Sequence, residues 1–472
     1  MAKIKESIKR NISIIDRTIT SFLEKEYKDF SIYCAESRAL IGLDGLKRTS
    51  RKILYAALYG SLKNGEQRKV PNVAGDTLNL TLYPHGDVSL NSVCCNLAKE
   101  HLWNVNPLYI DSQNGTLRSD VSASARYLYV RLSKYANIWK TDLDLCEKQY
   151  DEGQQIEHKC FLPICCTGLM ARQQGIGVGY AFSSMSYNPL DVIDGSLEYL
   201  KSKKKDDKLK DFVLHPYIRG IKSKNWKYET EENGVSHWVN YGEFSWNDKK
   251  KEIIITDLPY DMEFATFEKL LNKLVENEDI KDWSNYSHGN DIEYHIDCKR
   301  GKWAKTLKGK LLNKKIENKL KLRKAVPNDN LWVLDENNKI HHFFTPQEFI
   351  EYFTEWRLTK YTDRKKRLVK ILEERLKKND ELVKFITLVC NGKLKIRNRS
   401  KKDIKIDMDN YKLPIDLIST PMSKVTIEER DELLKQNESI RKELDYIKKT
   451  TEKQMYINDL NDLRKELEKD FK

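Results

Sequence analysis

Residues 38–55 read RALIGLDGLKRTSRKILY, and the architecture of the first third of the chain follows from this segment. The Asp44-Gly45 turn interrupts a pattern of apolar residues at helical spacing, which resumes from Lys47 to Leu62. A helix also precedes the turn, because apolar residues recur at helical steps from Ile4 to Tyr27. Helix, turn and basic helix together predict a helix-turn-helix unit.

Cations gather in and beside this segment, so several positive side chains can reach one phosphate backbone. They are Arg38, Lys47, Arg48, Arg51 and Lys52. A solvated basic face explains the same pattern, so contact with nucleic acid is one of two interpretations.

Two short motifs follow in the next 80 or so residues of the chain. In Tyr83-Pro84-His85-Gly86-Asp87, a proline and a glycine hold a histidine on a rigid turn before a helix expected over residues 88–101. In Ser124-Ala125-Arg126-Tyr127, small residues flank an Arg-Tyr pair ahead of a strand-like run over residues 127–132. Taken singly, each motif is more often structural than functional.

The composition restricts the classes of partner and of compartment. The chain has 472 residues and a net charge of +13, from 84 Lys and Arg against 71 Asp and Glu, so its surface attracts polyanions. No apolar run reaches the roughly 18–20 residues of a membrane span, and the polar start lacks a signal peptide. Nine scattered cysteines form neither a disulfide framework nor a zinc motif. We expect a soluble intracellular protein without a membrane partner.

The rest of the chain changes character near residue 346. From Pro163 to about Thr345 helix and strand signals are mixed, with a glycine-spaced segment at 175–179 and a strand-like run that ends at Pro259. From Phe349 two long apolar stripes flank an insert from about Asn391 to Pro421, which predicts an antiparallel coiled coil with a globular tip. The fold class is therefore a multidomain α+β protein.

In this order, the motifs resemble the DNA breakage-and-rejoining part of the type IIA DNA topoisomerases. The resemblance continues through Gly175 to Gly179, through Ile255-Thr256-Asp257-Leu258-Pro259 and through Glu355-Trp356-Arg357-Leu358, so it covers nearly the whole chain. The tail resembles that of eukaryotic and large-virus enzymes, whereas the length is that of a separate polypeptide of a larger complex, as in T-even phages. Tyr83 and Ser50 stand where bacterial relatives carry histidines.

The resemblance implies a role for each motif. Tyr127 would attack a DNA phosphodiester to form a transient 5′-phosphotyrosine, with Arg126 and His85 assisting and Arg38 holding the scissile region. DNA contacts would come from Lys47, Arg51, Lys52 and Ile176, the last as an apolar wedge between base pairs. No residue is assigned to a metal.

The resemblance also implies a division into regions. Residues 1–30 would form a helical segment that contacts a partner subunit, 31–155 a winged-helix cleavage domain, and 156–345 a tower domain. Residues 346–472 would form a coiled coil whose tip is a dimer contact and exit gate.

Cofactors and partners follow from what the sequence lacks. Asp142-Leu143-Asp144 and Asp407-Met408-Asp409 lack the glycine-rich strand end of a metal-binding Toprim site, and we find no phosphate-binding loop. We therefore expect Mg²⁺ and ATP to be bound by a large ATPase/Toprim subunit, in an A₂B₂ assembly on double-stranded DNA. The complex would act in the cytoplasm, in a phage-infected host or a nucleoid.

Two other hypotheses compete with this one. A non-catalytic DNA-binding coiled-coil protein would keep the basic helices without the chemistry, but the presence of Arg126, Tyr127 and His85 favours an enzyme. A tyrosine recombinase would place its tyrosine near the end of the chain, after an Arg-His-Arg set, whereas this Arg-Tyr pair comes early.

Overall fold

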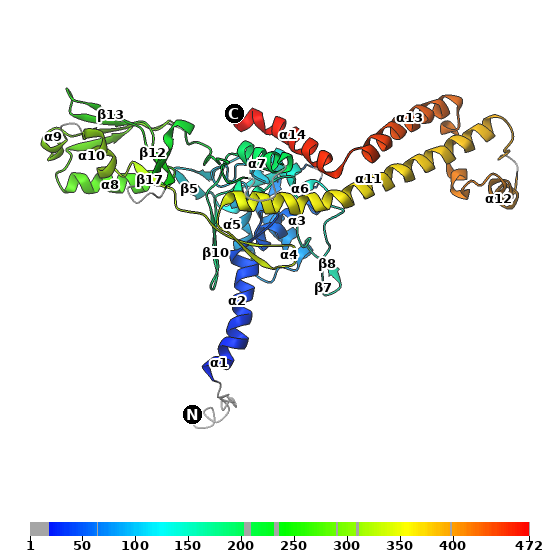
Figure 1. Ribbon diagram of the computed structural model, residues 1–472, viewed down its shortest axis with the longest axis horizontal. Helices are drawn as coiled ribbons and strands as arrows, with labels where there is room; N and C mark the ends of the chain where they lie inside the picture. Colours follow the sequence, from blue (N-terminus) through cyan, green and yellow to red (C-terminus); the bar gives the residue numbers. More distant parts are fainter. Residues whose placement is uncertain are drawn as a thin grey trace. The chain divides into compact units, whose positions relative to one another are not determined.

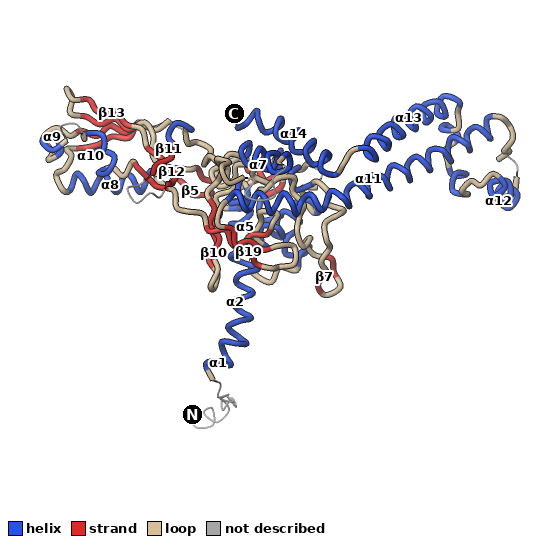
Figure 2. Tube along the Cα trace, viewed as in Figure 1, coloured by secondary structure: helices blue, strands red, loops and turns tan. Residues whose placement is uncertain are grey.

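The computed structural model describes residues 18–63, 65–202, 209–230, 236–288, 291–307, 311–396 and 399–471 (Figure 1). The chain divides into two compact units. The second comprises Leu200–Ser202 and Thr354–Lys469, and the first comprises the other described residues. All described strands lie in the first unit (Figure 2). The chain is thus a multidomain α+β protein, as the sequence predicted. None of its described helices is long and apolar enough to cross a membrane.

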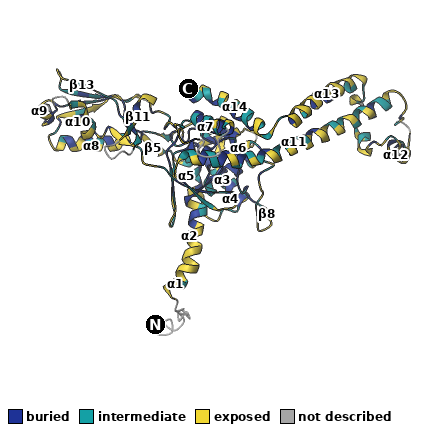
Figure 3. Cartoon of the chain, in the orientation of Figure 1, coloured by how far each residue is buried: buried dark blue, intermediate teal, exposed yellow. Residues whose placement is uncertain are grey.

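The first described element is a helix whose α and π turns alternate. It consists of α1 (Ile19–Phe22), η1 (Leu23–Tyr27), α2 (Lys28–Cys34) and η2 (Ala35–Ala39). The Thr18 hydroxyl caps it by accepting a hydrogen bond from the Ser21 amide at 3.2 Å. Most of its residues before Cys34 are exposed to solvent (Figure 3). The helix predicted from Ile4 is therefore present from residue 19 on, and its earlier part lies outside the described residues.

Three helices and a small sheet follow. The helices are α3 (Arg48–Tyr59), α4 (Val70–Thr81) and α5 (Asp87–Leu97), and they pack on one another. The antiparallel sheet has the order β2-β6-β3, from Arg68–Lys69, Tyr129–Leu132 and Leu108–Ile110. The helices predicted from Lys47 to Leu62 and over residues 88–101 are confirmed as α3 and α5, and each ends earlier than predicted. The strand begins at Tyr129, because Ala125–Tyr127 forms the 3₁₀ turn η3.

A five-stranded sheet joins distant parts of the first unit. Strand β18 (Asn330–Leu334) pairs in parallel with β1 (Ile41–Gly42) and antiparallel with β10 (Ala181–Ser184) and β19 (Ile340–Phe343), and β9 (Gln173–Ile176) pairs with β10. Strands from before residue 155 and after residue 156 therefore share one sheet. This sheet crosses the domain boundary that we expected between these two residues, and that boundary stays a prediction.

The outer part of the first unit carries two more sheets. One has the order β13-β14-β16-β15, and the other β11-β12-β17. Helices α8 (Phe264–Glu276), α9 (Trp303–Thr306) and α10 (Leu312–Lys319) accompany them. Ile253, Ile255, Phe267, Leu271 and Tyr294 form part of one buried core there. The four strands of the first sheet are, in chain order, Phe244–Asn247, Glu252–Ile255, Asp282–Asn285 and Tyr294–Asp297, and those of the second are Trp226–Thr230, Ser236–Tyr241 and Arg323–Ala325.

The strand that we predicted to end at Pro259 is shorter. It ends at Ile255, because the next residues form a turn that the buried Arg118 holds. The Arg118 guanidinium donates to the Asp257 carboxylate at 3.0 Å and to the carbonyl oxygens of Leu258 and Pro259 at 2.6 Å each. Turn carbonyls bonded to a side chain are not available to a strand ladder.

The second unit is built on two long antiparallel helices, α11 (Pro346–Cys390) and α13 (Ile427–Lys449). Leu372, Ile440 and Ile447 are buried between them, and Lys448 pairs with Glu373 at 2.7 Å. At the far end α12 (Lys401–Asn410) and its flanking segments enclose a separate apolar core of Phe385, Ile386, Leu394, Ile404, Met408, Leu413 and Leu433. The predicted helical hairpin with a globular tip is therefore observed. Helix α14 (Glu452–Phe471) follows.

Candidate active site and nucleic-acid interface

His85 stands on the turn between α4 and α5. Helix α4 ends because Leu82 adopts a left-handed conformation, with φ of 44°, and Gly86 caps the start of α5. Pro84 between them restricts the backbone, and the His85 ring is exposed. The turn therefore presents the imidazole at the rim of a groove of about 1230 Å³, which Arg38 and Arg48 also line.

Tyr33 of α2 links two of the predicted site residues. Its hydroxyl oxygen lies 2.8 Å from Nε2 of His85, at hydrogen-bond distance. The guanidinium carbon of Arg38 lies 5.4 Å from the centre of the Tyr33 ring, within the range of a cation–π contact. The structure therefore brings Arg38 and His85 together through a tyrosine that the sequence analysis did not select. No sequence signal pointed to it, since Tyr33 and His85 are 52 residues apart.

Tyr127 is exposed beside α4 and α5, the two helices that flank the turn of His85. It ends the turn η3, which packs against α4 and α5, and its side chain is 69% exposed. The Arg126 guanidinium carbon lies 5.9 Å from the centre of its ring. Tyr127 is absent from the residues that line the His85 groove.

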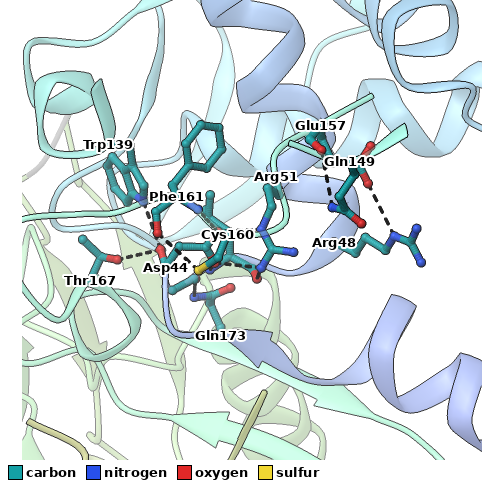
Figure 4. Close-up of polar contacts among 12 residues, drawn as sticks. Asp44, Arg48, Arg51, Trp139, Gln149, Glu157, Cys160, Phe161, Thr167 and Gln173 are labelled. Atoms are coloured by element: carbon teal, nitrogen blue, oxygen red, sulfur yellow. Dashed lines mark hydrogen bonds and ion pairs between the residues drawn. The ribbon is translucent and has the colours of Figure 1, made fainter. Parts of the chain in front are cut away.

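Asp44 anchors the turn on which the basic helix begins (Figure 4). The fully buried carboxylate accepts hydrogen bonds from Arg51 Nε at 2.6 Å and Nη2 at 2.9 Å, and from the Phe161 amide at 3.1 Å. Its backbone oxygen accepts from Trp139 Nε1 and Thr167 Oγ1, each at 2.9 Å. Burial opposes the charge on Arg51, yet Asp44 raises the pKa of that guanidinium above its usual range.

Glu157 holds the next cation of the helix. Its buried carboxylate lies 2.7 Å from Lys52 Nζ. The other carboxylate oxygen lies 3.4 Å from Arg48 Nε (Figure 4). Burial lowers the pKa of Lys52, and Glu157 counteracts this effect. Arg51 and Lys52, which we expected to contact DNA, thus pair with buried carboxylates, Arg51 with Asp44 seven residues away and Lys52 with Glu157 105 residues away. The DNA contacts proposed below do not include them.

Lys47 and Ile176 meet at the hairpin of β9 and β10. Lys47 Nζ donates to the carbonyl oxygen of Gln174 at 2.6 Å, and burial lowers the pKa of this amine. Ile176 is 76% exposed at the end of β9. Gly175 lies so close to η2 that a Cβ there would stand 1.9 Å from the carbonyl oxygen of Ala39. Only glycine permits this approach, which fixes the exposed isoleucine beside the helix of Arg38.

The arrangement of His, Cys, Asp and Glu side chains bears on where a metal ion could bind. Among the described residues, no group of three or more His, Cys, Asp and Glu side chains is arranged to hold an ion. Asp407, in one of the acidic pairs that the sequence analysis considered, forms an ion pair with Arg399. No step proposed for this chain therefore passes through a metal bound to it.

Comparison with known proteins gives consistent matches over this whole architecture. The family profile of DNA gyrase/topoisomerase IV A subunits matches residues 38–463. The mitochondrial DNA topoisomerase 2 of Dictyostelium discoideum is 30% identical over 98% of the chain, which covers 36% of that protein. For the DNA topoisomerase 2 of Invertebrate iridescent virus 6, the identity is 24%, over 95% of the chain and 39% of the relative. The chain thus spans less than half the length of these relatives.

A solved structure shares the fold. The crystal structure of the DNA-binding, cleavage and re-ligation domain of Plasmodium falciparum topoisomerase II superimposes with a TM-score of 0.81. The match covers 95% of this chain and 65% of that one, at 23% identity. The likeness therefore extends over both compact units.

Proposed function

Because this chain belongs to the family of DNA gyrase/topoisomerase IV A subunits, we propose that it is the DNA breakage-and-rejoining part of a type IIA topoisomerase. The observation that carries the proposal is Tyr127, an exposed tyrosine that follows Arg126 on a turn packed against α4 and α5. Most tyrosines bury part of the ring, so such exposure beside a cation suits a nucleophile.

The chemistry is a reversible transesterification. The phenolic oxygen of Tyr127 bonds to the phosphorus of a DNA phosphodiester while the bond to the 3′ oxygen breaks. The phenol loses its proton, and the departing 3′ oxygen gains one to become a hydroxyl. Arg126 neutralises charge that builds on the phosphate oxygens. Since no water enters, the 3′ hydroxyl can attack the phosphotyrosine in reverse and reseal the strand.

The groove and the hairpin supply the DNA contacts in this proposal. Arg38 and His85 line the groove, where a guanidinium and an imidazole N–H can donate to phosphate oxygens. Ile176 projects from the hairpin as the apolar wedge that kinks the duplex. Lys47 supports this hairpin through Gln174 and adds positive charge beneath it.

In the proposed double-strand break, two copies of the chain would each contribute one tyrosine. Mg²⁺ and ATP would be bound by a second polypeptide of the ATPase/Toprim type, in an A₂B₂ assembly. The complex would work on double-stranded DNA in the cytoplasm, in a nucleoid or a phage-infected host. In this proposal, helices α3, α4 and α5 and their small sheet correspond to the winged-helix domain. The two outer sheets correspond to the tower, and the tip of the second unit corresponds to the exit gate.

We expect the purified chain to bind DNA but to form a covalent adduct only when the partner polypeptide and Mg²⁺ are also present. The test incubates chain, partner and supercoiled plasmid, denatures the mixture rapidly and separates free DNA from protein-linked DNA. ATP-dependent strand passage by the chain alone would contradict the division of labour. Tight DNA binding by the complete mixture with no adduct under any condition would favour the alternative of a non-catalytic DNA-binding protein.

The tip of the second unit is expected to hold two copies of the chain together. Ile406 on α12 is 59% exposed although it lies beside the core of the tip. The substitution Ile406→Lys keeps that core but places a charge on its outer surface, and it should weaken self-association about tenfold or more. Sedimentation velocity over a dilution series measures this effect.

Ile371 provides the matched control for the tip. It lies in the middle of α11, is 48% exposed, and is not among the residues of the tip core. The substitution Ile371→Lys should leave the self-association unchanged. Equal dimerisation of both variants and the parent chain would show that the tip is no dimer contact.

A further inference from the structure

The His85 side chain is positioned from two directions. Nε2 lies 2.8 Å from the Tyr33 hydroxyl, and the edge of the ring meets Tyr83 with 5.4 Å between the ring centres. Tyr83 is itself tied to the turn, since its hydroxyl lies 3.2 Å from Ser89 Oγ, which donates to the Gly86 carbonyl at 3.0 Å. An exposed histidine on a loop is thus held in one orientation.

Tyr33 is held as firmly as the histidine. It lies in the last turn of α2, next to Cys34 and Ala35, which are 8% and 2% exposed and anchor the helix in the first unit. Arg38 covers the Tyr33 ring at 5.4 Å. The backbone that carries the Tyr33 side chain is therefore anchored beside the groove.

We propose that Tyr33 is a positioning residue which reserves Nε2 of His85, so that Nδ1–H is the donor presented to the DNA phosphate. The inference rests on the proposed function. Nδ1 makes no hydrogen bond within the described part of the chain, so it is available to a ligand.

The chemistry supports the same assignment in both charge states of the imidazole. In the neutral ring, the proposal has the Tyr33 O–H donate to Nε2, which places the only ring proton on Nδ1. In the imidazolium, Nε2–H donates to the Tyr33 oxygen and Nδ1–H remains a donor. Without the hydroxyl, a neutral ring is free to place its proton on Nε2, and a donor is then no longer fixed toward the phosphate.

The substitution Tyr33→Phe removes the hydroxyl and retains the ring under Arg38. In the complete mixture of chain, partner, DNA and Mg²⁺, it should lower the rate of adduct formation about tenfold, with little change in DNA affinity. Tyr59→Phe is the matched control, because the Tyr59 hydroxyl also lies at hydrogen-bond distance, 2.9 Å, from Nε2 of a histidine, His158, and neither residue lines the groove. It should cleave DNA at the parental rate.

A double-mutant cycle separates positioning from packing. If Tyr33 acts through His85, Tyr33→Phe should have no further effect on the cleavage rate in a His85→Ala background. Equal rate losses from Tyr33→Phe in both backgrounds would overturn the proposal, because they would show a role of the hydroxyl that is independent of the histidine.

The tautomer itself can be observed without any activity. In the full chain with ¹⁵N-labelled histidine, long-range ¹H–¹⁵N correlation spectra distinguish Nδ1–H from Nε2–H, and His85→Gln assigns the signals. We expect Nδ1–H for neutral His85 in the parent and a shift toward Nε2–H in Tyr33→Phe. An unchanged tautomer would overturn the proposal. If instead the spectra behave as expected and no chain, parental or variant, ever forms an adduct, the proposed function fails and the positioning role stands.

Discussion

The variant Tyr127→Phe is expected to form no covalent protein–DNA adduct while it folds and binds DNA as the parent does. The substitution removes only the hydroxyl, and the ring that lies 5.9 Å from the Arg126 guanidinium remains. Loss of a nucleophile leaves binding intact but removes the chemical step, so cleavage should fall by roughly 10⁴-fold or more. Quantitative trapping after rapid denaturation measures the adduct, and a DNA-binding titration measures the affinity.

Tyr129 offers the matched control for this experiment. It lies two residues further on in β6, is 45% exposed and carries Lys69 at 5.8 Å from its ring centre. Tyr129→Phe should therefore cleave DNA at the parental rate. Parental adduct levels in Tyr127→Phe would assign the nucleophile to another residue, and a parallel loss in Tyr129→Phe would point to damage of the β6 region.

The second large effect is expected on stability. Asp44→Asn keeps the size of the side chain but leaves the buried Arg51 guanidinium without the carboxylate that it contacts at 2.6 and 2.9 Å. Breaking one side of a buried ion pair typically costs about 3–5 kcal/mol. The free energy of unfolding, measured by urea titration of the first transition, should fall by that amount.

An exposed ion pair of the same unit provides the comparison. Glu66 and Arg68 form a salt bridge with both side chains nearly half exposed. Glu66→Gln should change the free energy of unfolding by no more than about 1 kcal/mol, because water replaces the lost partner. Similar decreases in the free energy of unfolding of the two variants would show that burial does not account for the contribution of Asp44 to stability.

The sequence predicted the elements whose signals are local. The apolar spacing of α3 and α11 identified both helices, and the proline and glycine around His85 identified its turn. In α11, however, the apolar periodicity also included Ile371, which is exposed. Spacing alone does not tell which side of a long helix a partner covers.

The site was predicted less completely, because its decisive contacts join residues far apart in the chain. Lys52 and Glu157 are 105 residues apart, so a basic helix that suggested a DNA surface turned out to use part of its charge for the fold. Tyr33 was missed for the same reason. A single sequence shows which side chains are cations, but it does not show which carboxylates neutralise them.

The close approach of Gly175 to Ala39 in η2 couples the hairpin of Ile176 to the helix of Arg38. The space between Gly175 and the Ala39 carbonyl oxygen does not admit a Cβ atom, and Lys47 Nζ donates to the Gln174 carbonyl oxygen at 2.6 Å. The hairpin therefore packs tightly against the helix. In this arrangement, a force that bound DNA applies to Ile176 would be transmitted to the backbone beside Arg38. In the proposed function, a DNA duplex that does not bend around Ile176 would displace the backbone beside Arg38. Flexible base-pair steps would therefore be cut in preference to rigid ones.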